Sequence, residues 1–559
     1  MKIIKKIAAV LVLVTMIFTA SGCDLIREII NLYNVPSYSQ RKYIAPDKDA
    51  TDKLFEEIKT LCATSGNDNA IITKRNAFML KYSQAMTSRT VANLEYYNDV
   101  TDGQAKTRSE EIDVYFNQLH NQALEMEKTI LTSSYKDLLI DSLGQDYADQ
   151  ILGQTVKTDE MLDAEARITE LENSYSSLMA KADAQDVASE AAQIYKNLIV
   201  ERNKLAKLNK KRDGTPYSNY HEYAYAEIYG RDYTPEQANT FRQAIKDNFY
   251  AIGKKLNDTS SSFITSNALT LGLNESGIKQ IMPTIINNTA ESMLSSWDYM
   301  ISMGLYNFAV SEKKFNNSFV VEFQQYDDGF MFIDATGGLI NDLSTIIHEF
   351  GHYNAIFGAD EEKEGNSGIY SIDLAETHSQ AFELLTLPAV KKVLESNGYG
   401  SVYTAYADNL LLQSVWSMLS NSMFDEFEYT VYTADESLLN REFFENTFYS
   451  VWNNYWPMKN GKTNYEYYDI SHLFTSPSYC ISYSVSMVFA SEIWMSGTPV
   501  SDYLKVVSYG TGYNVKQVAS AVNLPDPLSA DNISKVAAHY KSQIQSMLGL
   551  SFGGGTFDA

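Results

Sequence analysis

The sequence predicts a mainly α-helical protein with one short β region, and three observations support this fold class. Apolar residues recur at the 3.6-residue spacing of a helix face, as in the run Ile168, Leu171, Tyr175 and Leu178. No proline occurs from Asp47 to Thr215, so no proline interrupts long helices there. Only residues 318–336, "SFVVEFQQYDDGFMFIDAT", combine two runs rich in Val, Phe and Ile with a turn sequence, which predicts a β-hairpin.

The first 23 residues have the pattern of a secretory signal. "MKIIKK" is positively charged, the apolar run that follows is short for a membrane span, and "TASGC" resembles a bacterial lipobox with Cys23 as the lipidated residue. We therefore expect an extracytoplasmic protein on the outer face of a bacterial membrane, held by its N-terminal lipid alone. The alternative is an uncleaved anchor helix. Residues 24–50 are expected to form a tether.

The charge of the chain excludes some partners. The formal net charge is −25, and it becomes −28 when the three lysines of residues 1–23 are removed. Such a surface argues against nucleic acid and anionic lipid as partners.

Cys62 and Cys480 either pair or remain two buried thiols, and two cysteines do not form a disulfide framework. The sequence does not set the oligomeric state.

The chain divides into two regions after the tether. Residues 51–211 have helical character, and "RDGTPYSNY", beginning at Arg212, predicts a boundary. In the second region, residues 212–548, a helix is expected to start with Thr234 as N-cap, Pro235 in the first turn and Gln237 completing a capping box. Residues 549–559 are expected to be a flexible tail.

Residues 343–358 predict a helix just after the hairpin. Its apolar stripe has four members: Leu343, Ile346, Ile347 and Phe350. Asn341 or Asp342 is expected to cap its start, and Gly358 to end it.

This helix carries the sequence "HEFGH". His348 and His352 are four residues apart and share a helix face, with β-carbons about 5–6 Å apart, so both imidazoles can bind one ion. Glu349 lies beside them, placed to take a proton from a water at the metal without being a ligand. This is the H-E-x-x-H arrangement of zinc peptidases. The alternative is a core helix with two structural histidines.

A zinc hydrolase needs a third protein ligand, which leaves the fourth position open. The downstream segment "SIDLAETHSQAFELL" offers four candidates: Asp373, Glu376, His378 and Glu383. The chemistry of the residues makes Glu376 and Glu383 equally good candidates for the third ligand, because they lie seven residues apart on one helix face.

"HEFGH" followed by "DLAETHSQAFE" resembles the thimet oligopeptidase and oligoendopeptidase F family of zinc metallopeptidases. That family carries D-x-x-E-x-x-S-Q-x-x-E on a second helix, and the first glutamate binds the metal. The resemblance therefore implies one Zn²⁺ with Glu376 as the third ligand. Asp373 or Glu383 is then expected to hold the outer nitrogen of an imidazole, and His378 to lie behind the site or at the surface.

A third segment, "YYDISHLFTSPSYCISYSVS", resembles the family's H-F-Y-x-x-P-F-Y-x-x-x-Y sequence. His472, Tyr479 and Tyr483 match it, while Phe474 stands where the family has a tyrosine. The resemblance implies that Tyr483 or Tyr479 stabilises an oxyanion and that His472 assists. "GRDYTPE", residues 230–236, also resembles a family segment. Three other histidines lack metal-binding partners and are expected to be structural or exposed: His120, His221 and His539.

The resemblance extends over roughly residues 212–548. It implies two helical lobes around a deep channel, with the small β region beside the zinc helix, and hydrolysis of internal bonds in short unfolded peptides. The strand that ends in "GFMFIDAT" is expected to offer its edge to an extended peptide. The alternatives are a dipeptidyl carboxypeptidase with similar zinc spacing and a lipid-anchored peptide-binding protein without turnover. A further alternative is a structural surface protein, but it would give the candidate metal ligands and Glu349 no role.

Overall fold

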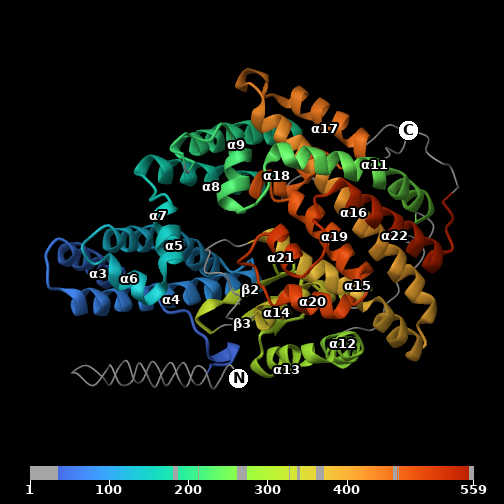
Figure 1. The fold of residues 1–559 in the computed structure, drawn as a ribbon, viewed down its shortest axis with the longest axis horizontal. Helices are drawn as coiled ribbons and strands as arrows, with labels where there is room; N and C mark the ends of the chain where they lie inside the picture. Colours follow the sequence, from blue (N-terminus) through green and yellow to red (C-terminus); the bar gives the residue numbers. More distant parts are fainter. Residues whose placement is uncertain are drawn as a thin grey trace.

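The structure, a computed structural model, describes residues 35–552 apart from 180–186, 212, 261–273, 327, 336–339, 360–370, 457–462 and 464. The expected signal segment, Cys23, most of the expected tether and residues 553–559 lie outside these ranges. Within the described residues the protein is mainly α-helical with one small sheet, which confirms the predicted fold class (Figure 1).

The first helices form a lobe of their own, at the left of Figure 1. They pack around a separate hydrophobic core that includes Phe78, Leu119 and Ile130. The bounds are α3 Lys48–Cys62, α4 Asp68–Asn98, α5 Gly103–Leu131, α6 Lys136–Leu143 and α7 Gln145–Gly153. The length of α4 and α5 agrees with the absence of proline in this region.

Helices α8 (Asp159–Met179) and α9 (Ala188–Leu208) pack with the C-terminal helices instead. Their buried side chains belong to the large core of the second region, and the ring of Tyr175 stacks on Phe474 with centroids 3.9 Å apart. Helices α8 and α9 therefore join the larger core, together with Val91 and Leu94 of α4, while the boundary near Arg212 stays a prediction.

The remaining helices build the larger lobe. Their bounds are α10 Tyr220–Tyr223, the π-helical turn η2 Ala224–Ile228, α11 Pro235–Ser260, α12 Glu275–Thr289, α13 Leu294–Met303, α14 Ile340–Gly358, α15 Ile372–Ser396, α16 Gly400–Thr433, α17 Arg441–Tyr455, α18 Ser471–Thr475, α19 Ile481–Met495, α20 Pro499–Val507, α21 Val515–Ala521 and α22 Ala530–Leu548. Helix α15 contacts α14, α16 and α19. The predicted capping box of α11 is confirmed: Thr234 N–H donates to Gln237 Oε1 at 2.9 Å, and Gln237 N–H donates to Thr234 Oγ1 at 3.3 Å.

The sheet has three strands in the order β1-β3-β2. β2 (Phe319–Phe323) and β3 (Asp328–Phe332) pair antiparallel, which confirms the predicted hairpin, and β1 (Tyr306–Asn307) lies parallel to β3. β3 is the central strand and is fully buried, so the prediction that this strand offers an edge to peptide is wrong. Helix α14 packs against β3 and β2, which places the sheet beside the predicted zinc helix.

Part of the expected tether is folded. Arg41 precedes α3, and its guanidinium donates to Asp328 of β3 at 2.7 and 2.6 Å in a pair that is almost fully buried.

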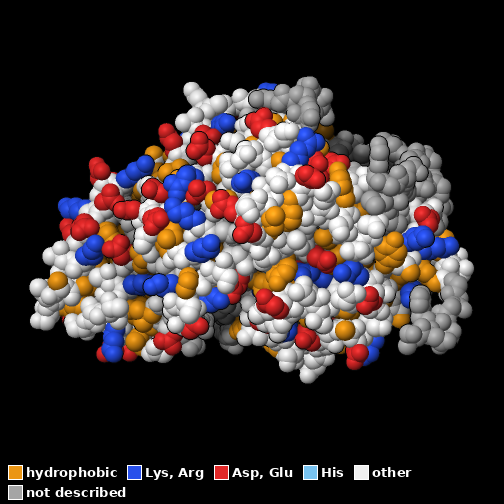
Figure 2. All heavy atoms as spheres, turned by 90° about the horizontal axis from the view of Figure 1, so that it is seen from above, with side chains coloured by type: hydrophobic (Ala, Val, Ile, Leu, Met, Phe, Trp, Pro, Cys, Tyr) orange, Lys and Arg blue, Asp and Glu red, His pale blue; other side chains and the backbone are white. Residues whose placement is uncertain are grey.

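Cys62 and Cys480 are both free thiols. None of the helices within the described residues combines the length and the apolar character that crossing a membrane requires. Figure 2 shows acidic and basic side chains intermixed over one face of the molecule.

Candidate metal centre

Helix α14 brings His348 and His352 together. Their ring centroids are 4.9 Å apart, and the four predicted stripe residues beneath them are buried. The helix ends at Gly358, as predicted, but it begins at Ile340. Asn341 and Asp342 therefore lie in its first turn and are not caps.

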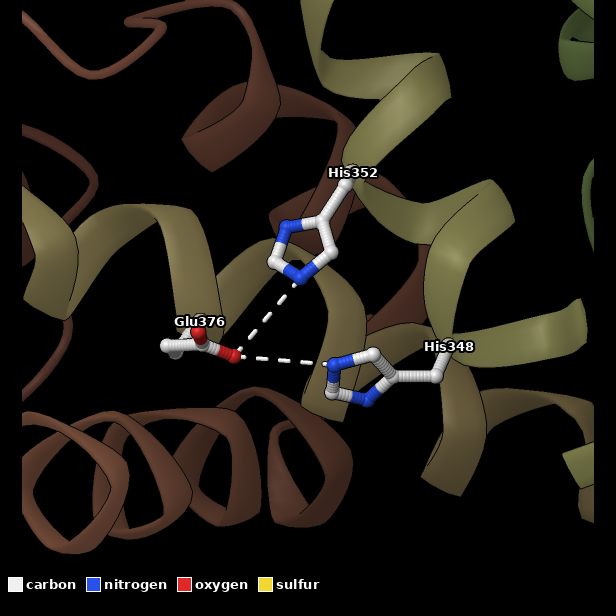
Figure 3. A group of neighbouring side chains, drawn as sticks. All are labelled: His348, His352 and Glu376. Carbon is white, nitrogen blue, oxygen red and sulfur yellow. Dashed lines mark ion pairs between the residues drawn. The ribbon is translucent and has the colours of Figure 1, made fainter. Parts of the chain in front are cut away.

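Glu376 lies in the second turn of α15 and points at both imidazoles (Figure 3). Its Oε2 atom is 3.6 Å from Nε2 of His348 and 3.6 Å from Nε2 of His352. These distances match the roughly 3.3–3.6 Å that separates ligands bound tetrahedrally at about 2.0–2.2 Å from one ion. The three ligand atoms all lie within 4.8 Å of one another. The donor set therefore fits one divalent cation, with a fourth position left open.

Glu383, two turns further along α15, contacts the other side of His348. Its Oε1 atom forms a hydrogen bond with Nδ1 of that ring. Burial lowers the pKa of His348, but Glu383 and Glu376 outweigh it and raise the pKa well above the usual value. Burial lowers the pKa of His352 to about 4, against the opposing charge of Glu376. Burial raises the pKa of Glu376, yet both histidines and Tyr479 bring it down to about 2.

Glu349 is a buried acid with an unsatisfied oxygen. Only 6% of its surface is exposed, and its Oε2 atom has no hydrogen-bond partner among the described residues. Burial raises its pKa to about 7; the charges of Glu376 and Glu383 add to the rise, and that of His348 opposes it. A carboxyl in this environment is suited to exchanging protons near neutral pH.

The third predicted segment faces the same centre. Tyr479 Oη donates to Glu376 Oε1 at 2.8 Å. The ring of Tyr483 is 5.1 Å from that of Tyr479, and the His472 ring is 5.5 Å from Tyr479 and 6.0 Å from Tyr483. Burial raises the pKa of both phenols well above the usual value, which keeps them protonated as donors.

Two predicted residues lie elsewhere. Asp373 is 3.7 Å from Nε of Arg231, whereas Glu383 is hydrogen-bonded to Nδ1 of His348, so among the described residues Glu383 is the one of the two acids that holds a histidine. His378 is fully buried, so of its two expected positions the one at the surface is wrong. Of the histidines without metal-binding partners, His221 is buried and bonded to Ser478, and His120 is exposed.

Further residues hold the site, and the first of them, Gln380, is the glutamine of the D-x-x-E-x-x-S-Q-x-x-E pattern that the sequence resembles. Gln380 of α15 donates to the Tyr483 carbonyl at 3.3 Å and accepts from Ser486 at 2.8 Å, which ties α15 to α19. Arg231 and Glu428 contact Ser478, next to Tyr479. Arg231 lies in "GRDYTPE", the segment already singled out by resemblance; nothing in the sequence marks Glu428.

Two imidazoles, a carboxylate and a neighbouring acid on this helical scaffold define a metallopeptidase. Residues 303–533 match Peptidase family M3, and this range contains the complete candidate centre. This part of the chain is therefore similar to that family.

Solved structures share the fold. A structure titled PZ peptidase A with inhibitor 2 is 17% identical, with a TM-score of 0.74 over 91% of this chain and 99% of that one. A putative oligoendopeptidase F from Bacillus anthracis is 16% identical, with a TM-score of 0.73 over 91% and 98%. Metallocarboxypeptidase 1 of Trypanosoma cruzi is 12% identical, with a TM-score of 0.54 over 89% and 99%. A search of curated proteins found no match.

Proposed function

We propose that this protein is a zinc-dependent oligopeptidase that hydrolyses internal bonds of short unfolded peptides. The observation that carries the proposal is the convergence of His348, His352 and Glu376 beside the unpartnered oxygen of Glu349. Zinc suits two imidazoles and one carboxylate with an open fourth position. When bound there, it would polarise the substrate carbonyl and lower the pKa of water.

The residues of the chain supply the proton transfers. Glu349 accepts the proton of the attacking water and delivers it to the leaving amine. Because the Tyr479 hydroxyl is engaged by Glu376, we assign the developing oxyanion to the Tyr483 hydroxyl. One such donor is worth about 10²–10³ in rate. His472 lies beside both phenols and assists them.

The charges around the centre favour an endopeptidase. A carboxypeptidase has to bind the free C-terminal carboxylate of its substrate, for which a cation is suited. The charges with the largest effect on the pKa of Glu349 and His472 belong to His348, Glu376 and Glu383, so the charge around these two residues is mainly acidic. The fold likeness to a metallocarboxypeptidase keeps a dipeptidyl carboxypeptidase as the second candidate. Cleavage of a peptide with a blocked C-terminus separates the two, since an endopeptidase tolerates the block.

We also propose that the protein acts outside the cytoplasm, held to the membrane through lipidated Cys23. The "TASGC" sequence supports this. Radiolabelled palmitate incorporation that disappears in Cys23→Ala tests it.

The catalytic proposal is tested by Glu349→Gln. The variant should bind zinc as the wild type does, because Glu349 is not a ligand, and should lose about 10²–10⁴ in kcat because the base is gone. Metal content and hydrolysis of a mixed peptide library are measured on the same preparations.

Glu395→Gln, on the exposed end of α15, is the matched control and should keep full turnover. A chelator should abolish hydrolysis, and added zinc should restore it. Wild-type-like turnover by zinc-loaded Glu349→Gln would remove Glu349 as the base.

A further inference from the structure

Ser478 stands immediately before Tyr479 in an unusual backbone conformation. Its φ angle is +65°, and among the described residues only Asn523 shares a positive φ without being glycine. The left-handed conformation costs a residue with a β-carbon roughly 1–2 kcal/mol. A residue keeps such a conformation only where contacts with the surrounding structure outweigh this cost.

All three polar groups of Ser478 are held by side chains from other segments. Its N–H donates to both carboxyl oxygens of Glu428 of α16 at 3.0 Å, and its carbonyl accepts from Arg231 Nη2 at 2.8 Å. Its hydroxyl is 2.8 Å from Nδ1 of His221 of α10. Glu428 and His221 are almost fully buried, so water does not compete for these bonds.

Arg231 also reaches the helix that carries Glu376. Its guanidinium lies 3.7 Å from Asp373, one turn ahead of Glu376, and donates to Ser482 at 2.7 Å beyond the turn. The rings of Tyr225 and Tyr229 lie 4.3 and 4.6 Å from the guanidinium carbon, which restricts its movement. One cation therefore joins the turn before Tyr479 to α15.

We propose that Glu428, Arg231 and His221 are positioning residues that hold Ser478 in its left-handed conformation and thereby hold the Tyr479 hydroxyl on Glu376. None of the three contacts the candidate metal ligands, so they act through the turn. The consequence for turnover rests on the proposed function; the consequence for the Tyr479–Glu376 hydrogen bond does not.

Glu428→Leu tests the proposal, with Glu428→Gln as its matched control. Leucine removes the acceptor for the Ser478 N–H, so kcat should fall about 10- to 100-fold with little change in KM, since losing a hydrogen-bond partner of a metal-binding carboxylate costs about that much in activity. Glutamine keeps an acceptor of the same shape and should stay within about threefold of the wild type. Zinc content should be equal in all three proteins.

Ser478→Gly supplies a rescue that a general loss of stability would not show. Glycine adopts positive φ without steric cost, so Glu428→Leu with Ser478→Gly should recover most of the lost kcat. If Glu428→Leu does not fold, Ser478→Ala against Ser478→Gly serves instead. Both lose the hydroxyl, and only alanine keeps the cost of positive φ, so alanine should give the lower kcat.

Crystal structures give a readout without turnover. In Glu428→Leu the distance from Tyr479 Oη to Glu376 Oε1 should exceed hydrogen-bond range, while the glutamine variant keeps the 2.8 Å of the wild type. An unchanged distance in Glu428→Leu, or equal losses in the leucine and glutamine variants with no rescue by glycine, overturns the inference. A wild-type protein that hydrolyses no peptide overturns the proposed function and leaves this structural test intact.

Discussion

The side chain of Glu383 decides which nitrogen of His348 faces a metal ion. Its hydrogen bond to Nδ1 leaves Nε2 directed at Glu376, 3.6 Å away. Metal-bound histidines usually carry such a partner, which fixes the tautomer and the ring orientation and raises the basicity of the ligand nitrogen. Glu383 therefore belongs to the centre although it does not contact the open position.

We predict that Glu383→Ala weakens zinc binding about 10- to 100-fold, because the imidazole of His348 loses its orienting acceptor. Competition with a chromophoric chelator measures the affinity. Glu383→Gln keeps an acceptor and should lose less. An affinity in Glu383→Ala equal to that of the wild type would show that the ring is held without this bond.

Spacing along one helix predicts His348, His352 and Glu349, because their relation is local. Glu376 required resemblance to break its tie with Glu383, and both acids contact His348, from its two sides. The pairing of Asp373 with Arg231 joins residues far apart in the chain, and no local pattern signals it.

At the scale of elements, the centre depends on how closely α15 approaches α14. A β-carbon added at Gly351, between the two histidines, would lie 2.6 Å from Ser379 Cα and 2.8 Å from the His378 carbonyl. Both are backbone atoms of α15 and cannot rotate away. Glycine at this position therefore sets the separation between the helix with the imidazoles and the helix with the carboxylate.

We predict that Gly351→Ala pushes the two helices apart, lowers the free energy of unfolding by about 1–3 kcal/mol through overpacking, and reduces zinc affinity. Urea unfolding and chelator competition measure the two effects. Gly153→Ala is the matched control, since a β-carbon there meets nothing within 4 Å. Zinc affinity that stays at the wild-type value in Gly351→Ala would contradict this account of the helix contact.

Element types are more predictable than their pairing. The hairpin and the capping box of α11 follow from local turn and cap chemistry, and both are confirmed. β1 has two residues, too few for a periodic signal, and its parallel pairing makes β3 central. The start of α14 at Ile340 moves the expected caps into the first turn, where Asp342 still favours the positive end of the helix dipole.

At the scale of the molecule, packing decides which hydrophobic core each helix joins, and the amino-acid composition of the helices does not reveal this. Helices α8 and α9 lie in the region of helical character that the sequence assigns to residues 51–211, yet they join the core of the larger lobe. The segment before α3 makes a further long-range link. The Arg41 guanidinium lies against the rings of Phe323 and Tyr326 and pairs with Asp328, 287 residues away. The end of the expected tether thus anchors on the sheet that supports α14.

We predict that Arg41→Met lowers the free energy of unfolding by about 3–5 kcal/mol, because it leaves the charge of buried Asp328 without its guanidinium. The double variant Arg41→Met with Asp328→Asn should be more stable than Arg41→Met alone, since no carboxylate charge then remains in the buried position. Urea unfolding of the wild type, both single variants and the double variant gives the coupling energy of the pair. Additive single effects would mean that Arg41 acts through its contacts with the two rings rather than through Asp328.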